Sequence, residues 1–440
     1  MNRIAFTQIC ALCFSINLSI HAQNKNDSLL QEASLKNCVD YALTHQPSVQ
    51  QSLIDSAITE RTIKSKLADW YPQLNLNYNY QHFFQLPKSI FQGNIITTGL
   101  DNTSYAQFGL TQTIFDRDVL FASKSAKDVR IQARQNIVND KIDVAVIVSK
   151  AFYDVLLTQK QIEILDDDIV LLQRSLKDAE NQYKGGLVDK IDFKRATISL
   201  NNALASKRQN EEQLKAKYAF LKEQMGYPPS GHLNLIYDST QMFSAVFLDT
   251  TQKVNMENRI EYQILQTRKR LLEENVKYNK WSFIPSVSAY GNYNFNWFNN
   301  DFSKLYSQNF PTSFAGLSLS FPIFQGTKRS QEIKQAQLQL DRADYDVIAL
   351  RNTINTEFEE AMATYKSNVS NYIILKENLD LSEEVYNTVQ LQYRAGVKTY
   401  LDVIVSQTDL RTSQVTYINA LYQVLSSKLD VERALGSIKY

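Results

Sequence analysis

The sequence predicts a mainly α-helical protein that also carries a membrane β-barrel. Three observations favour this fold class. The chain has only 12 glycines and 8 prolines in 440 residues, so it has few turn formers and its elements should be long. Residues 117–183 and 328–395 contain neither glycine nor proline. Four shorter segments alternate apolar residues with polar, uncharged ones, which is the pattern of strands.

The first 22 residues are typical of a secretory signal peptide. Arg3 supplies the positive charge, residues 4–20 are uncharged and mostly apolar, and Ala22 offers a small residue at the expected cleavage site. A short membrane anchor is the alternative, although no basic cluster follows the apolar run. We therefore expect residues 1–22 to be removed on export.

The composition gives no indication of an enzyme, a metal, a cofactor or a nucleic-acid partner. The formal net charge is +1, so no basic surface is expected. His45, His82 and His232 are far apart in sequence, and after export Cys38 is the single cysteine. The three aspartates at residues 166–168 lie in a helical run and should point in different directions, which predicts a solvated face.

The chain contains two copies of one structural repeat, about 210 residues apart. Residues 183–192 align with residues 393–402 without a gap, and Met225-Gly226 aligns with Leu435-Gly436. Each copy has the order helix, strand, strand, long helix, tight turn, helix. We expect a first repeat at residues 23–226, an inter-repeat linker (equatorial segment) at residues 227–257, and a second repeat at residues 258–440.

The expected strands have the pattern of membrane-spanning strands. They cover about residues 73–84, 104–115, 285–298 and 312–324. From Val287 to Trp297 every second residue is apolar or small, and the residues between are almost all serine or asparagine. Residues 281–300 and 305–327 contain no charged residue. A soluble sheet with one wet face is the alternative, but such a face would carry lysine and glutamate, so lipid on one face and water on the other is expected.

The helical segments are predicted to form two long antiparallel hairpins, at about residues 117–226 and 328–436. A helix over residues 117–183 would be roughly 100 Å long at about 1.5 Å per residue. Apolar residues near the first turn recur at spacings of three and four, as in Leu165, Ile169, Leu172 and Leu176. This spacing indicates coiled-coil seams, and helices of such length do not fit a compact bundle.

Four strands cannot close a membrane barrel, for which about eight are needed. The strands of several chains must therefore share one barrel, and the helices would continue it as a tunnel. Two other classes explain part of the pattern. An elongated periplasmic scaffold explains the coiled coils but not the uncharged strands, and a passive outer-membrane porin explains the strands but not the helices.

Three features of the sequence resemble those of the TolC-like family of outer-membrane efflux proteins. These are the doubled order of elements, the strand end Leu317-Ser-Leu-Ser-Phe-Pro-Ile-Phe-Gln-Gly326 before a basic helix start, and the paired Tyr-x-x-Gly turns followed by Asp192 and Asp402. The resemblance implies a homotrimer in the outer membrane, with a twelve-stranded barrel in lipid and a coiled-coil tunnel in the periplasm. It also implies that the trimer is the exit channel of an inner-membrane pump, and that a periplasmic adaptor protein joins the channel to the pump.

The resemblance also suggests residues that close the periplasmic end. Tyr393 matches a tyrosine of the family's closing network, and Asp192 matches the aspartate that it bonds. Lys398 stands where the family has an arginine. The positive charge is kept, but the planar guanidinium that can donate two parallel hydrogen bonds is lost. Asp402 matches a constricting acidic ring, whereas the second acidic position is Val405 here.

Each of these residues also has a plainer interpretation. Asp402 can be the N-cap of the returning helix, and Tyr393 can be a seam residue of the coiled coil. The glycines can simply supply the positive φ that a tight turn needs. The resemblance adds that the tip is the surface gripped by the adaptor, with the candidates Gly185, Gly186, Leu187, Gly396 and Val397. The identity of the exported substrate and the class of pump are left open.

Overall fold

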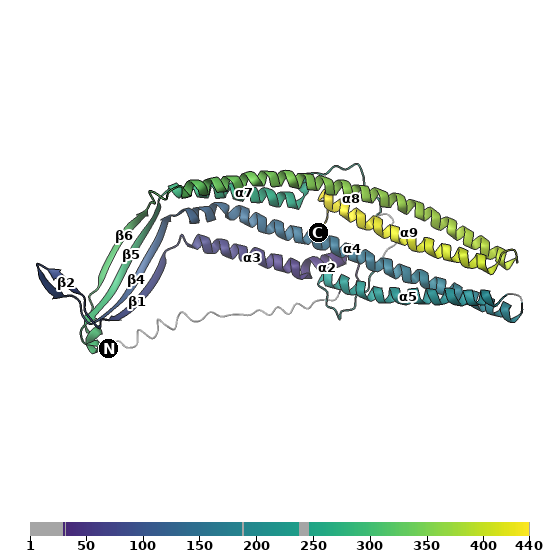
Figure 1. The fold of residues 1–440 in the computed structure, drawn as a ribbon, viewed down its shortest axis with the longest axis horizontal. Coiled ribbons are helices and arrows are strands. Elements are labelled where there is room, and N and C mark those ends of the chain that lie inside the picture. The colour runs from purple at the N-terminus through teal and green to yellow at the C-terminus, as the bar shows by residue number, and fades with distance from the viewer. Residues whose placement is uncertain (1–29, 31, 187–188, 237–245, 440) are drawn as a thin grey trace.

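The computed structural model describes residues 30, 32–186, 189–236 and 246–439. They form an elongated molecule with a β-sheet at one end and long helices running away from it (Figure 1). The predicted signal peptide, residues 1–22, lies outside the described residues. The mainly α-helical architecture with a separate sheet confirms the predicted fold class.

The first repeat begins with two helices that are nearly continuous in sequence and ends with a helical hairpin. Its elements are α2 (Leu35–His45), α3 (Pro47–Ala68), β1 (Gln73–His82), β2 (Lys88–Phe91), β3 (Asn94–Thr97), β4 (Asn102–Phe115), α4 (Arg117–Lys184) and α5 (Lys190–Met225).

The second repeat follows the same order with fewer additions. Its elements are the short 3₁₀ helix η2 (Met256–Asn258), α7 (Ile260–Lys280), η3 (Trp281–Phe283), β5 (Ser286–Asn299), η4 (Phe302–Ser307), β6 (Thr312–Ser320), α8 (Lys328–Arg394) and α9 (Tyr400–Leu435). The 68 residues of α4 correspond to the 67 of α8, and α5 and α9 have 36 residues each.

The long helix α4 lies at the centre of the helical part. It contacts α3 and α7 over the half next to the sheet, and α5 and α9 over the half that leads to the tip (Figure 1). Asp116 caps its first turn, where the side chain accepts from the backbone N–H of Asp118 at 2.7 Å. With neither proline nor glycine inside, α4 continues to Gly185.

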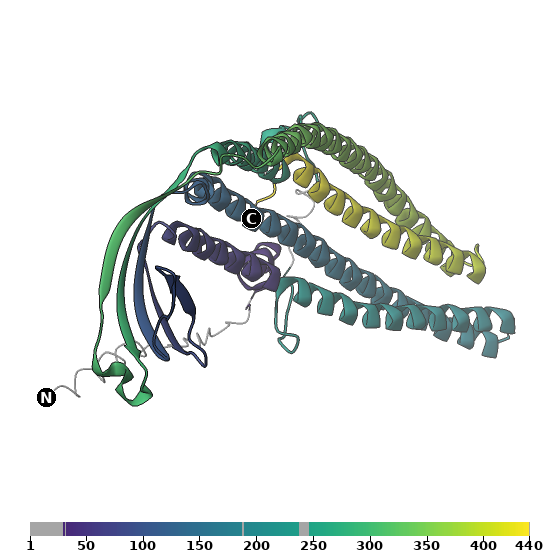
Figure 2. The same ribbon diagram turned by 60° about the vertical axis from the view of Figure 1, so that its left-hand side comes forward.

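The sheet has the strand order β1-β4-β5-β6, with every neighbouring pair antiparallel. Figure 2 shows it as a curved sheet beside the ends of the helices. Since β1 and β6 are at the two ends of this order, each has one edge without a strand partner among the residues that the structure describes. None of the four strands contains a charged residue.

The register confirms that the sheet has one apolar and one polar face. Successive residues of a strand point to opposite faces, and paired residues share a face. One row across the four strands reads Leu74, Leu110, Gly291 and Ala315. A row on the opposite face reads Asn77, Gln107, Asn294 and Thr312.

The sheet and its connections differ from the sequence prediction in three places. The chain between β1 and β4 contains the β2–β3 hairpin, and the chain between β5 and β6 contains η4. The last strand ends at Ser320 instead of residue 324. Pro322 explains this end, because proline has no N–H for the ladder.

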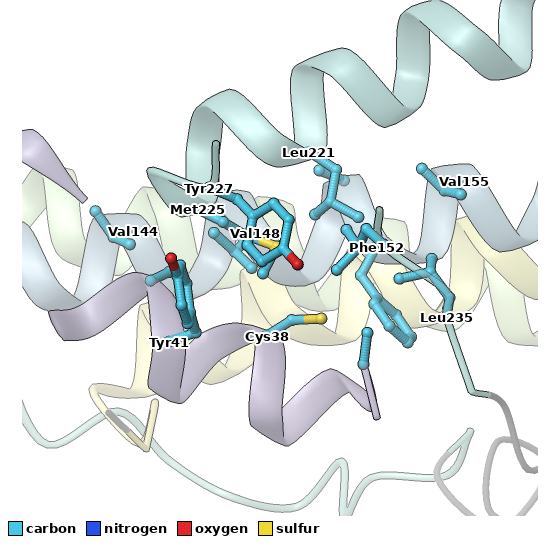
Figure 3. Close-up of a cluster of buried hydrophobic side chains, with 14 of the residues drawn as sticks. Cys38, Tyr41, Val144, Val148, Phe152, Val155, Leu221, Met225, Tyr227 and Leu235 are labelled. Carbon is cyan, nitrogen blue, oxygen red and sulfur yellow. The ribbon is translucent and has the colours of Figure 1, made fainter. Parts of the chain in front are cut away.

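Two hydrophobic cores lie at mid-length of the helices, one in each repeat. The first joins α2, α4 and α5 to the chain after α5, through Cys38, Phe152, Leu221 and Leu235 among others (Figure 3). The second joins α8 and α9 to the inter-repeat chain. Here the Tyr365 hydroxyl donates to the carbonyl of Val246 at 2.8 Å. These cores anchor the chain between the repeats onto the helices.

Candidate functional site: the far ends of the helical hairpins

The turns of both hairpins lie at the end of the molecule opposite the sheet (Figure 1). Gly186 has φ +74° and Gly396 has φ +73°, so the two repeats use the same left-handed turn residue. Val397 is 73% exposed, and Gly185 caps the end of α4. Leu187 lies outside the described residues. The remaining tip candidates are therefore brought together at one exposed end.

Asp402 takes part in a capping box at the start of α9. The N-cap of α9 is Thr399, three positions before Asp402. The interpretation of Asp402 as the N-cap residue is therefore wrong. The Thr399 backbone N–H and hydroxyl donate to Oδ2 of Asp402 at 2.9 and 2.7 Å, and the Thr399 hydroxyl accepts from the Asp402 N–H at 3.3 Å. The spacing Thr399-x-x-Asp402 is a sequence signal for this motif.

The carboxylate of Asp402 stays exposed and charged in this arrangement. Hydrogen bonds from the side chain and then the backbone of Thr399 lower its pKa, and the nearby Lys398 ammonium acts in the same direction. Lys398 Nζ lies 3.9 Å from Oδ1, the oxygen not used by the cap. One side chain therefore starts the helix and also presents a negative charge at the tip.

Tyr393 connects the two hairpins, but through a partner that the sequence did not suggest. Its hydroxyl donates to Oε1 of Gln182 on α4 at 3.2 Å, instead of to Asp192. Asp192 lies in the first turn of α5. Gln182 directly precedes Tyr183, which is the counterpart of Tyr393 in the first repeat, and no sequence signal distinguishes it.

Tyr400 is a buried residue of the tip that sequence reasoning missed. It forms a small apolar cluster with Ala179 of α4 and Ala196 of α5, and its side chain is 4% exposed. Its hydroxyl is buried and has no hydrogen-bond partner among the described residues. Burial raises the pKa of Tyr400, and the nearby Tyr393 and Asp192 raise it further. The four long hairpin helices thus meet around one tyrosine.

The aspartate run at residues 166–168 is only partly solvated. Asp166 and Asp167 are exposed, as predicted, but Asp168 is 6% exposed and the prediction was wrong for it. Its Oδ1 accepts from Nε2 of Gln407 at 2.7 Å and its Oδ2 from Nη1 of Arg411 at 3.1 Å, both on α9. The helix periodicity alone could not show that a second helix covers this position.

Neither a metal site nor a membrane-crossing helix is found in the described ranges. Those residues include no cluster of three or more histidine, cysteine, aspartate or glutamate side chains that could hold a metal ion. In the same ranges, every helix is too short or too polar to cross a lipid bilayer.

A charge-free sheet with one apolar face, continued by long coiled-coil hairpins with polar tips, defines the class of outer-membrane channels that extend into the periplasm. The chain belongs to the outer membrane efflux protein family, whose sequence model matches residues 38–227 and 257–437. Membership confirms the resemblance, the outer-membrane location and a role in transport instead of enzyme catalysis.

The sequences of individual relatives align with nearly the whole chain. It is 22% identical to the outer membrane protein TolC of Escherichia coli over 435 residues, which cover 93% of this chain and 84% of that protein. It is also 22% identical to the outer membrane protein OprJ of Pseudomonas aeruginosa, over 93% of this chain and 85% of OprJ. The fold is similar to that of the Vibrio cholerae outer membrane protein VceC, with a TM-score of 0.73 at 15% identity over 91% of this chain and 96% of VceC.

Proposed function

We propose that three copies of this chain form one outer-membrane exit channel. Each copy gives four strands to a twelve-stranded barrel, and the six hairpins continue the barrel as a tunnel through the periplasm. A periplasmic adaptor binds the tips and connects the tunnel to an inner-membrane pump. The observation that carries this proposal is a four-stranded sheet with two open edges, β1 and β6.

The open edges favour closure by further copies of the chain. Strands β1 and β6 have 10 and 9 residues, and neither contains a proline or a charged residue that would protect an edge. In lipid every backbone N–H and C=O needs a partner, so a sheet with free edges is not stable there. Pairing β1 of one copy with β6 of the next satisfies both edges around a ring.

The exposure of the sheet supports lipid on its apolar face. Leu74 at one edge is 68% exposed and Leu317 on the other edge strand is 72% exposed. Such a face is unfavourable in water at about 25 cal/mol per Å² of apolar surface and is stable against acyl chains. The opposite face, with its asparagine and glutamine side chains, suits a water-filled lumen.

The tip supports the roles of gate and adaptor surface. Asp402 and Lys398 present charge at the exposed end, and Tyr393 and Asp192 lie beside the Tyr400 cluster. Three copies of Asp402 around one axis would attract cations and repel one another. The exposed turn residues Gly186, Gly396 and Val397 have small or apolar side chains, so an adaptor helix can pack closely against them.

The mass of the particle extracted from outer membranes in mild detergent, with the detergent mass subtracted, tests this proposal. Three chains of 50.6 kDa, less the signal peptide, support the shared barrel. A single chain per particle, or extraction without detergent, contradicts the proposal. Either result would favour the alternative of an elongated periplasmic scaffold.

A further inference from the structure

The two repeats of one chain are tied together by a line of polar contacts between α4 and α9. These helices run antiparallel, so the residue number falls on α9 as it rises on α4. The residue numbers of each contacting pair add up to nearly the same total, which shows that all the contacts belong to one register. From the sheet side to the tip, the pairs are Asp143–Arg433 (2.6 Å), Lys150–Asp430 (2.6 Å), Gln161–Asn419 (2.9 Å) and Asp168 with Arg411 (3.1 Å) and Gln407 (2.7 Å).

The Asp168 contact differs from the other ion pairs because it is buried. The side chain of Asp168 is 7% exposed, whereas those of Asp143 and Asp430 are 36% and 45% exposed. Gln407 is buried as well. A buried carboxylate is strongly unfavourable unless it is paired, and here both oxygens accept hydrogen bonds from α9. Sliding α9 along α4 at this point would leave the charge covered and without its partners, and lifting α9 away would break both bonds.

Beyond Asp168 the contact between the repeats becomes weak. Toward the tip, the described residues show one hydrogen bond between the hairpins, from Tyr393 to Gln182, and the small cluster around Tyr400. Gln182 lies 14 positions beyond Asp168 on α4, which is roughly 20 Å of helix. This last segment is held mainly by a neutral bond and a few apolar contacts.

The geometry points to Asp168 as the anchor at which the movable tip begins. We infer that α9 stays fixed to α4 on the sheet side of Asp168, and that opening breaks the Asp168 contacts and displaces the segment from there to the turns. Asp168 is thus a positioning residue, which acts through Gln407 and Arg411 and does not line the opening itself. This inference rests on the proposed channel function and names the place where its gate hinges.

Single-channel conductance in planar bilayers tests the anchor, with Asp168→Asn and Arg411→Met as the variants. Each should raise the ratio of open to closed time about tenfold, because a tenfold change corresponds to about 1.4 kcal/mol and one charge-assisted bond is lost. The double variant should add little to the larger single effect, since both remove the same contact. Asp166→Asn is the matched control, because Asp166 is exposed and pairs with Lys207 on α5 of its own hairpin. It should behave as wild type.

Disulfide trapping in the same variants separates an anchor from a general support of the fold. The pair Gln182→Cys/Tyr393→Cys lies in the segment beyond the anchor, and Gln161→Cys/Asn419→Cys lies on its other side. In an Asp168→Asn background, cross-linking at 182/393 should fall and cross-linking at 161/419 should stay as in wild type. Burial raises the pKa of the native Cys38 thiol to about 12, so Cys38 should not compete.

Several results would overturn the anchor. These are an unchanged open-to-closed ratio in both Asp168→Asn and Arg411→Met, an equal loss of cross-linking at both cysteine pairs, or loss of the wild-type particle mass in either variant. The last two would assign Asp168 to general stability. A wild-type protein that forms no pores contradicts the proposed function itself, so the two failures are distinguishable.

Discussion

The Tyr393 hydroxyl donates to Gln182 across the gap between the two hairpins, at 3.2 Å. It is the only hydrogen bond between the repeats at the tip among the described residues. Removing it with Tyr393→Phe should favour the open tip by up to about tenfold, since a neutral hydrogen bond contributes roughly 0.5–1.5 kcal/mol. Conductance recordings measure this change.

The matched control for this variant is Tyr183→Phe. Tyr183 occupies the equivalent position in the first repeat, but its ring stacks on Phe193 of its own hairpin at 6.4 Å. Loss of its hydroxyl should leave conductance unchanged. If both variants behave alike, the hydrogen bond to Gln182 has no role in closing the tip.

The charge and the capping role of Asp402 can be separated by two variants. Asp402→Asn removes the charge and keeps a side chain that can accept from Thr399, whereas Thr399→Ala removes the cap and keeps the charge. We expect Asp402→Asn to lower cation selectivity, measured as a shift in reversal potential. Thr399→Ala should keep selectivity and destabilise the start of α9 by about 1 kcal/mol. Unchanged selectivity in Asp402→Asn would exclude an acidic ring.

The pH at which Asp402 stops stabilising the start of α9 follows from its pKa. Hydrogen bonds from Thr399 lower that pKa below its ordinary value of 3.8. A lowered carboxyl pKa gives stability that is present above the ordinary value and is lost as the pH falls through the lowered one. The contribution of this cap to stability, measured as the difference in melting temperature between wild type and Thr399→Ala, should therefore persist from neutral pH to about pH 4 and be lost at lower pH. An earlier loss would indicate that another group sets it.

Glu432 on α9 should have the opposite pH dependence. Burial raises its pKa above the ordinary value of 4.5, and Lys428 only partly offsets this effect. A raised carboxyl pKa means that the folded protein holds the proton more tightly, so this group lowers stability as the pH rises above 4.5. Glu432→Gln should raise the melting temperature at pH 7 and change it less at pH 4. A lower melting temperature at pH 7 would contradict the burial effect.

The two returning helices end on glycines that touch backbone of their own repeat. A Cβ on Gly226 would lie 2.6 Å from the carbonyl oxygen of His45, and one on Gly436 would lie 2.7 Å from that of Asn258. Both residues have positive φ, so Gly226→Ala and Gly436→Ala combine backbone strain with a clash. Gly326→Ala is the control, because its φ is +60° but its surroundings are open.

Strain alone should destabilise Gly326→Ala by about 1–2 kcal/mol. The other two variants should lose clearly more, as measured by thermal unfolding in detergent. Equal losses in all three would show that the neighbouring backbone moves away without difficulty.

Most of the fold was predictable because its signals are local. The lack of proline and glycine predicts α4 and α8, and the two-residue period places Leu317 and Ser318 on opposite faces of β6. The repeat predicts that Gly186 and Gly396 play the same part. The site was less predictable because its key contacts join helices far apart in sequence. Periodicity marks Asp168 as one of three aspartates on a helix, and only the position of α9 shows that it is buried.

The β2–β3 hairpin was also not predicted, for a different reason. The β2–β3 hairpin has Ile90 and Ile95 paired on one face, both more than two-thirds exposed. Its segment has too few alternating residues between Pro87 and Gly99 for a strong strand signal. Short hairpins of this kind depend on their turn and surroundings more than on a pattern.

The orientation of the sheet gives the last prediction, which uses neighbouring residues of β6. Leu317 pairs with Ala289 on the apolar face and Ser318 pairs with Ser288 on the polar face. An arginine on a lipid-facing position destabilises a barrel by up to about 2–4 kcal/mol near the bilayer midplane, whereas lumen positions tolerate charge. Leu317→Arg should therefore reduce the amount of folded protein in the outer membrane. Ser318→Arg should assemble normally and make the channel less cation-selective, because it adds positive charge to a lumen without fixed charges. The reverse outcome, with Ser318→Arg failing to assemble, would place the asparagine-rich face against lipid and contradict the proposed barrel.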